Sequence, residues 1–216
     1  LETAETLGID APYLRLIAQK QKPMILSTGA ARYSDVRLAL QTIHPINKDV
    51  ILMQCTANYP TKDDEVNLNV IETYRKKFNI LVGYSDHSYG IGAAPYAVSK
   101  GAKIIEKHFT QSKNLTGPDH KASLNAEELK KMVKEIRKVE RYLGSSMKEL
   151  TESERETRKY VQKYLVAAQG IQNGEFFTEE NIVIKRTGRE GLSPHYYDRL
   201  IGTKAKRDYL KNEMID

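Results

Sequence analysis

Four short apolar runs recur along the first half of the chain. They read "MILS" from residue 24, "VILMQC" from 50, "ILVGYS" from 80 and "KIIEKHF" from 103, and their starts are 26, 30 and 23 residues apart. The segments between them, such as "VNLNVIETYRKKF", have the apolar spacing of amphipathic helices. This alternation of strand and helix predicts βαβ units and a parallel sheet, because strands that are apolar nearly throughout suit a sheet covered on both faces.

The pattern changes after the last of these runs. Asn125, with a glutamate three residues on, predicts a capped helix start, and Gly144 predicts the helix end. Segment 145–160 is charged and poor in apolar residues, and we interpret it as a linker. Short apolar stretches and turns such as "QNGE" then predict a second, small domain of mainly β character over 161–216. We therefore assign 1–144 to the first domain.

Polar clusters follow all four predicted strands, and they favour one type of α/β fold. The clusters are "STG" at 27–29, "CTANYP" at 55–60, "SDH" at 85–87 and "KHFT" at 107–110. In βα barrels the active site is built from several strand ends, whereas an open doubly wound sheet binds at one switch point, usually with a glycine-rich loop. No such loop follows these strands. We predict an α/β fold: the second half of a (β/α)8 TIM-type barrel, followed by the small domain.

Composition limits the classes of partner and the cellular compartment that we expect for this chain. The net charge is +6, but lysines and arginines alternate with glutamates in stretches such as "NAEELKKMVKEIRKVERYLG", which is typical of a solvated helix face rather than of a nucleic-acid site. No stretch is apolar enough for a membrane span, so we expect neither nucleic acid nor membrane as a partner. The single cysteine, Cys55, fits a reducing, cytoplasmic setting. Because the chain opens at Leu1 without a methionine, we expect it to be part of something longer.

Two histidines stand where two successive apolar runs stop. Side chains alternate along a strand, so Ser85 shares a face with His87, and Glu106 shares a face with His108. If the two strands are neighbours, the two imidazoles could share a metal ion, with the remaining positions left to water, substrate or a carboxylate. The alternative is that each histidine only satisfies a local hydrogen bond.

Other strand-end residues permit both a functional and a structural interpretation. Small hydroxyl and backbone donors suit a phosphate or carboxylate ligand, yet the same residues commonly cap the helices that follow; they are Ser27, Thr28, Gly29, Thr56 and Ser85. Cys55 ends an apolar strand with no obvious base nearby, which favours simple packing. Asp119, in "GPDHKAS", is either a turn residue or an acceptor for a sugar hydroxyl. Arg186 is unremarkable by spacing alone.

Four motifs, in order, resemble one known family. "CTANYPT", "VGYSDHSYGIGAAPYAVSKGAKIIEKHFT", "GPDHKASL" and "VIKRTGREGLSP" are similar to stretches of the sialic acid (N-acetylneuraminate) synthases. The resemblance runs from about residue 10 to the end. It implies a βα barrel followed by a SAF, or antifreeze-like, domain. It also implies an enzyme that condenses phosphoenolpyruvate with an N-acetylated hexosamine to give a sialic acid and phosphate.

The resemblance also implies roles for individual residues. His87 and His108 would bind a divalent metal ion, Mn²⁺ or Mg²⁺, that polarises the sugar aldehyde, and Asp119 would join them as a catalytic residue beside the sugar. The remaining substrate-binding positions would be Ser27 and Ser85 for phosphoenolpyruvate, Thr56 and Asn58 as weaker candidates, and Tyr59 and Arg186 for the sugar. Arg186 would reach the barrel of the other subunit in a domain-swapped homodimer.

The same resemblance bounds what the chain is expected to do. The first four strands of the family carry a catalytic glutamate and lysines that bind phosphoenolpyruvate, and none of that segment is here, so we expect this chain to be inactive alone. N-acetylmannosamine is the expected acceptor. One alternative is a legionaminate synthase that uses a diacetamido sugar. Another is a non-catalytic carbohydrate-binding or scaffolding fragment.

Overall fold

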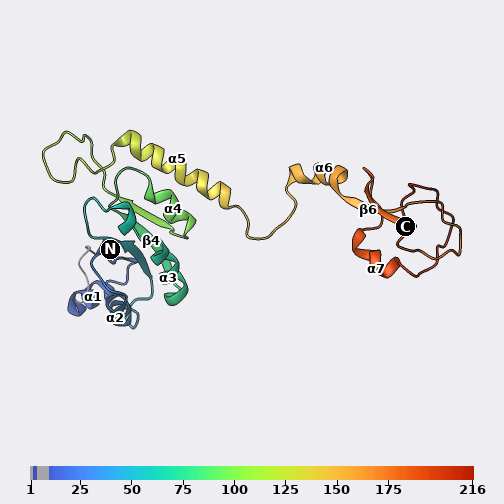
Figure 1. Cartoon of the computed structure of the whole chain (residues 1–216). Coiled ribbons are helices and arrows are strands. Elements are labelled where there is room, and N and C mark those ends of the chain that lie inside the picture. Colours follow the sequence, from blue (N-terminus) through green and yellow to red (C-terminus); the bar gives the residue numbers. More distant parts are fainter. Residues whose placement is uncertain (1, 4–9) are drawn as a thin grey trace. The chain divides into compact units, whose positions relative to one another are not determined.

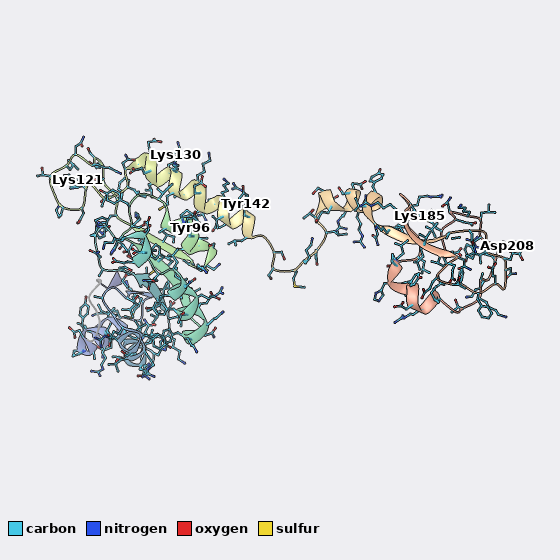
Figure 2. All side chains as sticks on the ribbon, viewed as in Figure 1. Tyr96, Lys121, Lys130, Tyr142, Lys185 and Asp208 are labelled. Carbon is cyan, nitrogen blue, oxygen red and sulfur yellow. The ribbon has the colours of Figure 1, made fainter. Side chains whose placement is uncertain are left out.

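The computed structural model describes residues 2–3 and 10–216, which form two compact units, Leu1–Ser146 and Met147–Asp216. Figure 1 shows the ribbon of both units, and Figure 2 shows their side chains. Among the described residues, no helix is both long and apolar enough to cross a membrane.

Unit 1 is built on a five-stranded sheet in which every strand pairs in parallel with the strand that follows it in the chain. Its strands are β1 (Glu2–Thr3), β2 (Met24–Ser27), β3 (Val50–Cys55), β4 (Leu81–Asp86) and β5 (Ile104–Lys107). Neighbouring parallel strands need crossover connections, and helices supply them. The predicted βαβ order and parallel sheet are confirmed.

Helices alternate with these strands along the chain (Figure 1). They are α1 (Ala11–Ala18), α2 (Tyr33–Ile43), the short 3₁₀ helix η1 (Asp63–Glu65), α3 (Asn69–Phe78), α4 (Ala93–Ser99) and α5 (Ala126–Leu143). Helix α5 begins as its sequence predicts: the Asn125 side chain accepts from the Glu128 N–H, and the Glu128 carboxylate accepts from the Asn125 N–H. This reciprocal capping satisfies two backbone donors that the helix leaves unpaired.

The core of unit 1 lies between the sheet and its helices. Alternate residues of the strands, among them Leu26, Leu52 and Val82, pack with helix residues such as Ile43 and Ile71, and all five are at most 2% exposed. Burying one such side chain stabilises the fold by about 1.5–3 kcal/mol. The strands are therefore fixed from the helix side, which leaves the opposite face of the sheet to present polar groups.

Unit 2 has its own core and a different architecture. Its elements are α6 (Glu152–Val161), β6 (Lys163–Ala167), β7 (Ile182–Arg186), η2 (Pro194–Tyr196) and α7 (Tyr197–Leu200). Strands β6 and β7 pair antiparallel, and isolated bridges such as Ile171 with Tyr209 extend this β character. Helix α6 takes up most of the segment interpreted as a linker, and none of its residues is buried.

A tight contact at Gly83 yields a test of the sheet. A Cβ added there would lie 2.2 Å from Met53 Sδ and 2.8 Å from the Ile104 carbonyl oxygen, which is backbone and cannot move aside. We expect Gly83→Ala to lower the free energy of urea unfolding by about 1–3 kcal/mol through overpacking. Gly92→Ala is the matched control, because nothing lies within 4 Å of its added Cβ. Equal stability of the two variants would contradict this packing of β3, β4 and β5.

Candidate active site

The strand ends of unit 1 meet because their register aligns them. Ser85 on β4 pairs with Cys55 on β3 and with Glu106 on β5. His87 and His108 each lie two residues beyond a member of that row, so both return to the same face of the sheet. The histidines that the sequence placed after two strands are thus brought together by strand pairing.

Four polar side chains and one aromatic ring make up this cluster. The Ser85 hydroxyl donates to Glu106 Oε1 at 2.6 Å, which ties β4 to β5. The imidazole rings of His87 and His108 lie edge to face, with centroids 5.8 Å apart. The ring of Tyr59 contacts both, at centroid distances of 4.4 and 4.3 Å.

The orientation of His87 is set by a backbone carbonyl. Its Nδ1 lies 2.9 Å from the Thr56 carbonyl oxygen, and the residue is 2% exposed. A carbonyl oxygen can only accept, so Nδ1 carries the proton and the lone pair of the neutral ring is on Nε2. Nε2 faces the Ser85 hydroxyl at 3.4 Å. A histidine whose Nδ1–H binds a carbonyl in this way is oriented as metal-ligating histidines commonly are.

A two-histidine metal site agrees with this donor set. Among the described residues, no group of three or more histidine, cysteine, aspartate and glutamate side chains is placed to hold a metal ion. A closed structural site of four protein ligands is therefore not formed by this part of the chain. An ion held by His87 and His108 alone would leave its remaining positions to water or substrate, as in an open rather than a closed metal site.

Cys55 lies closer to this cluster than its sequence indicates. Its Sγ is 3.9 Å from His87 Nδ1, but that nitrogen carries the proton bound to the Thr56 carbonyl oxygen and therefore offers the thiol no base. The residue is 5% exposed and ends β3, as expected for a packed side chain. Its neighbour Thr56 uses its hydroxyl to donate to the Glu65 carbonyl oxygen at 3.0 Å, and only its backbone oxygen meets His87.

The first predicted strand end lies farther along the same sheet edge. Ser27 ends β2 and is 4% exposed, and Thr28 donates to the Met53 carbonyl oxygen at 2.8 Å. Thr28, Cys55 and Thr56, together with residues of α3, line a cavity of about 520 Å³. Asn58 is exposed, and its carbonyl oxygen accepts from the Thr61 hydroxyl at 2.7 Å.

Asp119 is a loop residue of unit 1, and Arg186 belongs to unit 2. Asp119 is exposed in the loop after β5, and its carbonyl oxygen accepts from the Ala122 and Ser123 N–H groups. The adjacent His120 contacts the buried Thr110 hydroxyl at 2.8 Å, which ties this loop to the end of β5. Arg186 is the last residue of β7 in unit 2, and its side chain is exposed.

Glu106 belongs to the cluster but was not among the predicted site residues. Its carboxylate accepts from Ser85, on the face that also carries His87 and His108. Strand alternation in the sequence already put Glu106 on the face of His108. Its hydrogen bond to Ser85 on the neighbouring strand β4 depends on the register.

The fold of unit 1 is an α/β half-barrel: a parallel sheet of βα units whose strand ends bring histidine, serine and glutamate side chains together. Residues 6–148 match the NeuB family and residues 162–216 match the SAF domain. The chain belongs to the NeuB family and carries a SAF domain, and the resemblance to sialic acid synthases is confirmed.

Named relatives agree with this assignment. The chain is 40% identical, over 94% of its length and 62% of the relative, to the N,N'-diacetyllegionaminic acid synthase of Campylobacter jejuni. It is 36% identical, over 95% of its length and 59% of the relative, to the human N-acetylneuraminate-9-phosphate synthase. A solved N-acetylneuraminic acid synthetase from Leptospira borgpetersenii, in complex with citrate, matches with a TM-score of 0.70 and 34% identity over 74% of this chain and 56% of that one. The chain thus spans about 60% of the length of these curated relatives.

The His87 contact predicts its tautomer. In the metal-free chain in alkaline buffer, where imidazoles are neutral, we expect the proton on Nδ1 and the lone pair on Nε2. Long-range ¹H–¹⁵N correlation spectra distinguish the two tautomers by nitrogen shift, with His44 as an internal reference away from the strand ends. A proton on Nε2 would contradict the geometry and remove the nitrogen offered to a metal ion.

Proposed function

We propose that this chain is the second half of the barrel and the SAF domain of a synthase that condenses phosphoenolpyruvate with an N-acetylated hexosamine. The observation that carries the proposal is the pair of histidines held on one face of β4 and β5, with His87 fixed in the tautomer that offers Nε2. The family membership and the names of the relatives support the reaction class.

The reaction forms one carbon–carbon bond and one carbon–oxygen bond, and it breaks the carbon–oxygen bond that holds the phosphate. Carbon 3 of phosphoenolpyruvate attacks the aldehyde carbon of the open-chain sugar, whose oxygen takes up a proton. Water then adds to carbon 2 and loses one proton, and the bond from carbon 2 to the bridging oxygen breaks. The new hydroxyl on carbon 2 becomes the ketone as its proton passes to the departing phosphate. A divalent ion, Mn²⁺ or Mg²⁺, would supply Lewis-acid polarisation of the aldehyde oxygen when bound.

The chain's own residues orient the reactants in this proposal. His87 and His108 offer ring nitrogens from adjacent strands, and Tyr59 packs against both rings and restricts their rotation. Ser85 and Ser27 offer hydroxyl donors to the anionic phosphoenolpyruvate, and Thr56 and Asn58 are weaker candidates. The Ser85 proton now points to Glu106, so anion binding requires the hydroxyl to rotate away from that carboxylate.

Sugar recognition falls to groups outside the cluster. Asp119, held in a loop that His120 ties to Thr110, would accept a sugar hydroxyl over the strand ends. Arg186 would bind the N-acetyl group or a neighbouring hydroxyl, contributed across a domain-swapped homodimer. The acceptor we propose is N-acetylmannosamine. A second candidate is a diacetamido sugar, because the Campylobacter relative at 40% identity is a diacetyllegionaminic acid synthase.

Metal-dependent turnover tests the site. In the longest natural chain that contains these residues, Mn²⁺ should be required for phosphate release from phosphoenolpyruvate and N-acetylmannosamine. His87→Ala or His108→Ala should reduce kcat/KM by about 1000-fold or more, because a Lewis acid supplies several kcal/mol and each 1.36 kcal/mol is tenfold. His44→Ala, at the end of α2, is the control and should keep its rate. Near-normal turnover in either strand-end variant would rule out the shared metal site.

Arg186 has a separable kinetic role. Loss of a charged donor to a neutral partner costs about 1.5–3 kcal/mol, so Arg186→Ala should raise the KM for the sugar about ten- to hundredfold and leave the KM for phosphoenolpyruvate unchanged. Arg189→Ala, exposed three residues further on, is the matched control. A change confined to the KM for phosphoenolpyruvate would show that Arg186 does not bind the sugar.

A further inference from the structure

A buried ion pair lies behind the histidines, on the other face of the same two strands. Asp86 ends β4 and Lys107 ends β5, and the two residues are direct partners in the strand register. Lys107 Nζ lies 3.2 Å from Asp86 Oδ2, and the two side chains are 3% and 0% exposed. Each residue immediately precedes one of the histidines in the chain.

The pair belongs to a network that surrounds the end of β4. Asp86 Oδ1 accepts from the Ser88 N–H at 2.9 Å, from the Ser88 hydroxyl at 2.6 Å and from the Tyr84 hydroxyl at 3.2 Å. Burial and the Asp86 carboxylate raise the pKa of Tyr84, so its hydroxyl stays protonated and donates. Lys107 Nζ also donates to the Ser88 carbonyl oxygen. Asp86 Oδ2 makes no hydrogen bond within the described structure, so the charge of Lys107 compensates it.

Stability alone is a weak explanation for such a pair. Removing two charges from water is costly, and replacing a buried ion pair by apolar side chains of similar volume is often neutral or stabilising. What the pair adds is a directional tie between two neighbouring strand ends, because both charged groups converge on Ser88.

The network holds the backbone on both sides of His87. Asp86 precedes it, and Ser88, which both charged groups bind, follows it. The His87 carbonyl oxygen also accepts from the Thr61 N–H at 2.9 Å. On β5, the ion pair fixes Lys107, which is the residue immediately before His108. The positions of both imidazoles therefore depend on a contact that lies on the opposite face of the sheet.

We propose that the Asp86–Lys107 pair is a positioning device that sets the spacing of His87 and His108. The proposal rests on the proposed function in that these histidines share a divalent metal ion. Both residues of the pair lie on the face of the sheet opposite that of Ser85 and Glu106. The pair acts through the two strand ends, and its loss changes metal affinity through the histidine geometry.

The test compares single and double variants of the 216-residue chain. Asp86→Asn and Lys107→Met each leave one buried charge uncompensated, and both should lower the urea midpoint. The double variant Asp86→Asn/Lys107→Met leaves no buried charge there and should recover most of that loss. Mn²⁺ affinity, measured from the EPR signal of the free ion, should nevertheless stay at least about tenfold weaker in the double variant, as for other residues that orient metal ligands.

A second measurement, made without metal, accompanies the Mn²⁺ affinity. The ring centroids of His87 and His108 are 5.8 Å apart, so an NOE between their ring protons is expected in the metal-free chain. That NOE should weaken in the double variant. Ile43→Ala, a core change in α2, is the stability control: it should lower the urea midpoint and keep both the NOE and the Mn²⁺ affinity.

The outcomes separate the two proposals. A stable double variant with Mn²⁺ affinity within about twofold of the parent and an unchanged NOE would overturn the positioning role. If the parent and His87→Ala bind Mn²⁺ equally, the metal site fails, and the NOE alone then decides the positioning role. If the double variant does not fold, the variant Ser88→Ala tests the proposal, because it removes one hydrogen bond and no charge. A two- to tenfold loss of Mn²⁺ affinity is then expected, since such a bond is worth about 0.5–1.5 kcal/mol. Mn²⁺ affinity and an NOE equal to those of the parent would overturn the proposal.

Discussion

The register of β3, β4 and β5 is the constraint on which the candidate site depends. Cys55, Ser85 and Glu106 form one row across three parallel strands, and both histidines lie two residues beyond that row. A slip of one residue would turn His87 or His108 to the helix side and would expose an apolar face. Packing of residues such as Leu52 and Val82 against the helices resists that slip. The apolar core and the polar site are therefore two consequences of one pairing.

The ends of β4 and β5 are connected by side-chain contacts on both faces of the sheet. On the helix side, Asp86 and Lys107 tie β4 to β5 within a buried network. On the other side, Ser85 and Glu106 form a second tie, and His87 is oriented by a backbone carbonyl. Each strand end is thus held from both faces, which is the kind of support that a preorganised site needs. That arrangement offers ring nitrogens without a complete set of protein ligands, which suits an ion that must also meet a substrate.

Much of unit 1 follows from its sequence, because periodicity and capping are local properties. The apolar runs predicted the strands, and Asn125 with its glutamate predicted the start of α5. Cross-strand contacts were harder to predict. The hydrogen bond of Glu106, the approach of Cys55 to His87 and the burial of Lys107 depend on register, which arises from packing across the whole sheet. The roles of Asp119 and Arg186 rest on family resemblance, since a loop and a separate unit carry no periodic signal that relates them to the strand ends.

The most direct measurement of the central claim is pulsed EPR of Mn²⁺ bound to the longest natural chain that contains these residues. Labelling histidine with ¹⁵N allows the nitrogen couplings to the ion to be assigned and counted. A shared site predicts couplings from two directly bound imidazole nitrogens. One coupling should disappear in His87→Ala and the other in His108→Ala. A tightly bound Mn²⁺ without histidine nitrogen coupling would show that the two strand ends do not hold the metal.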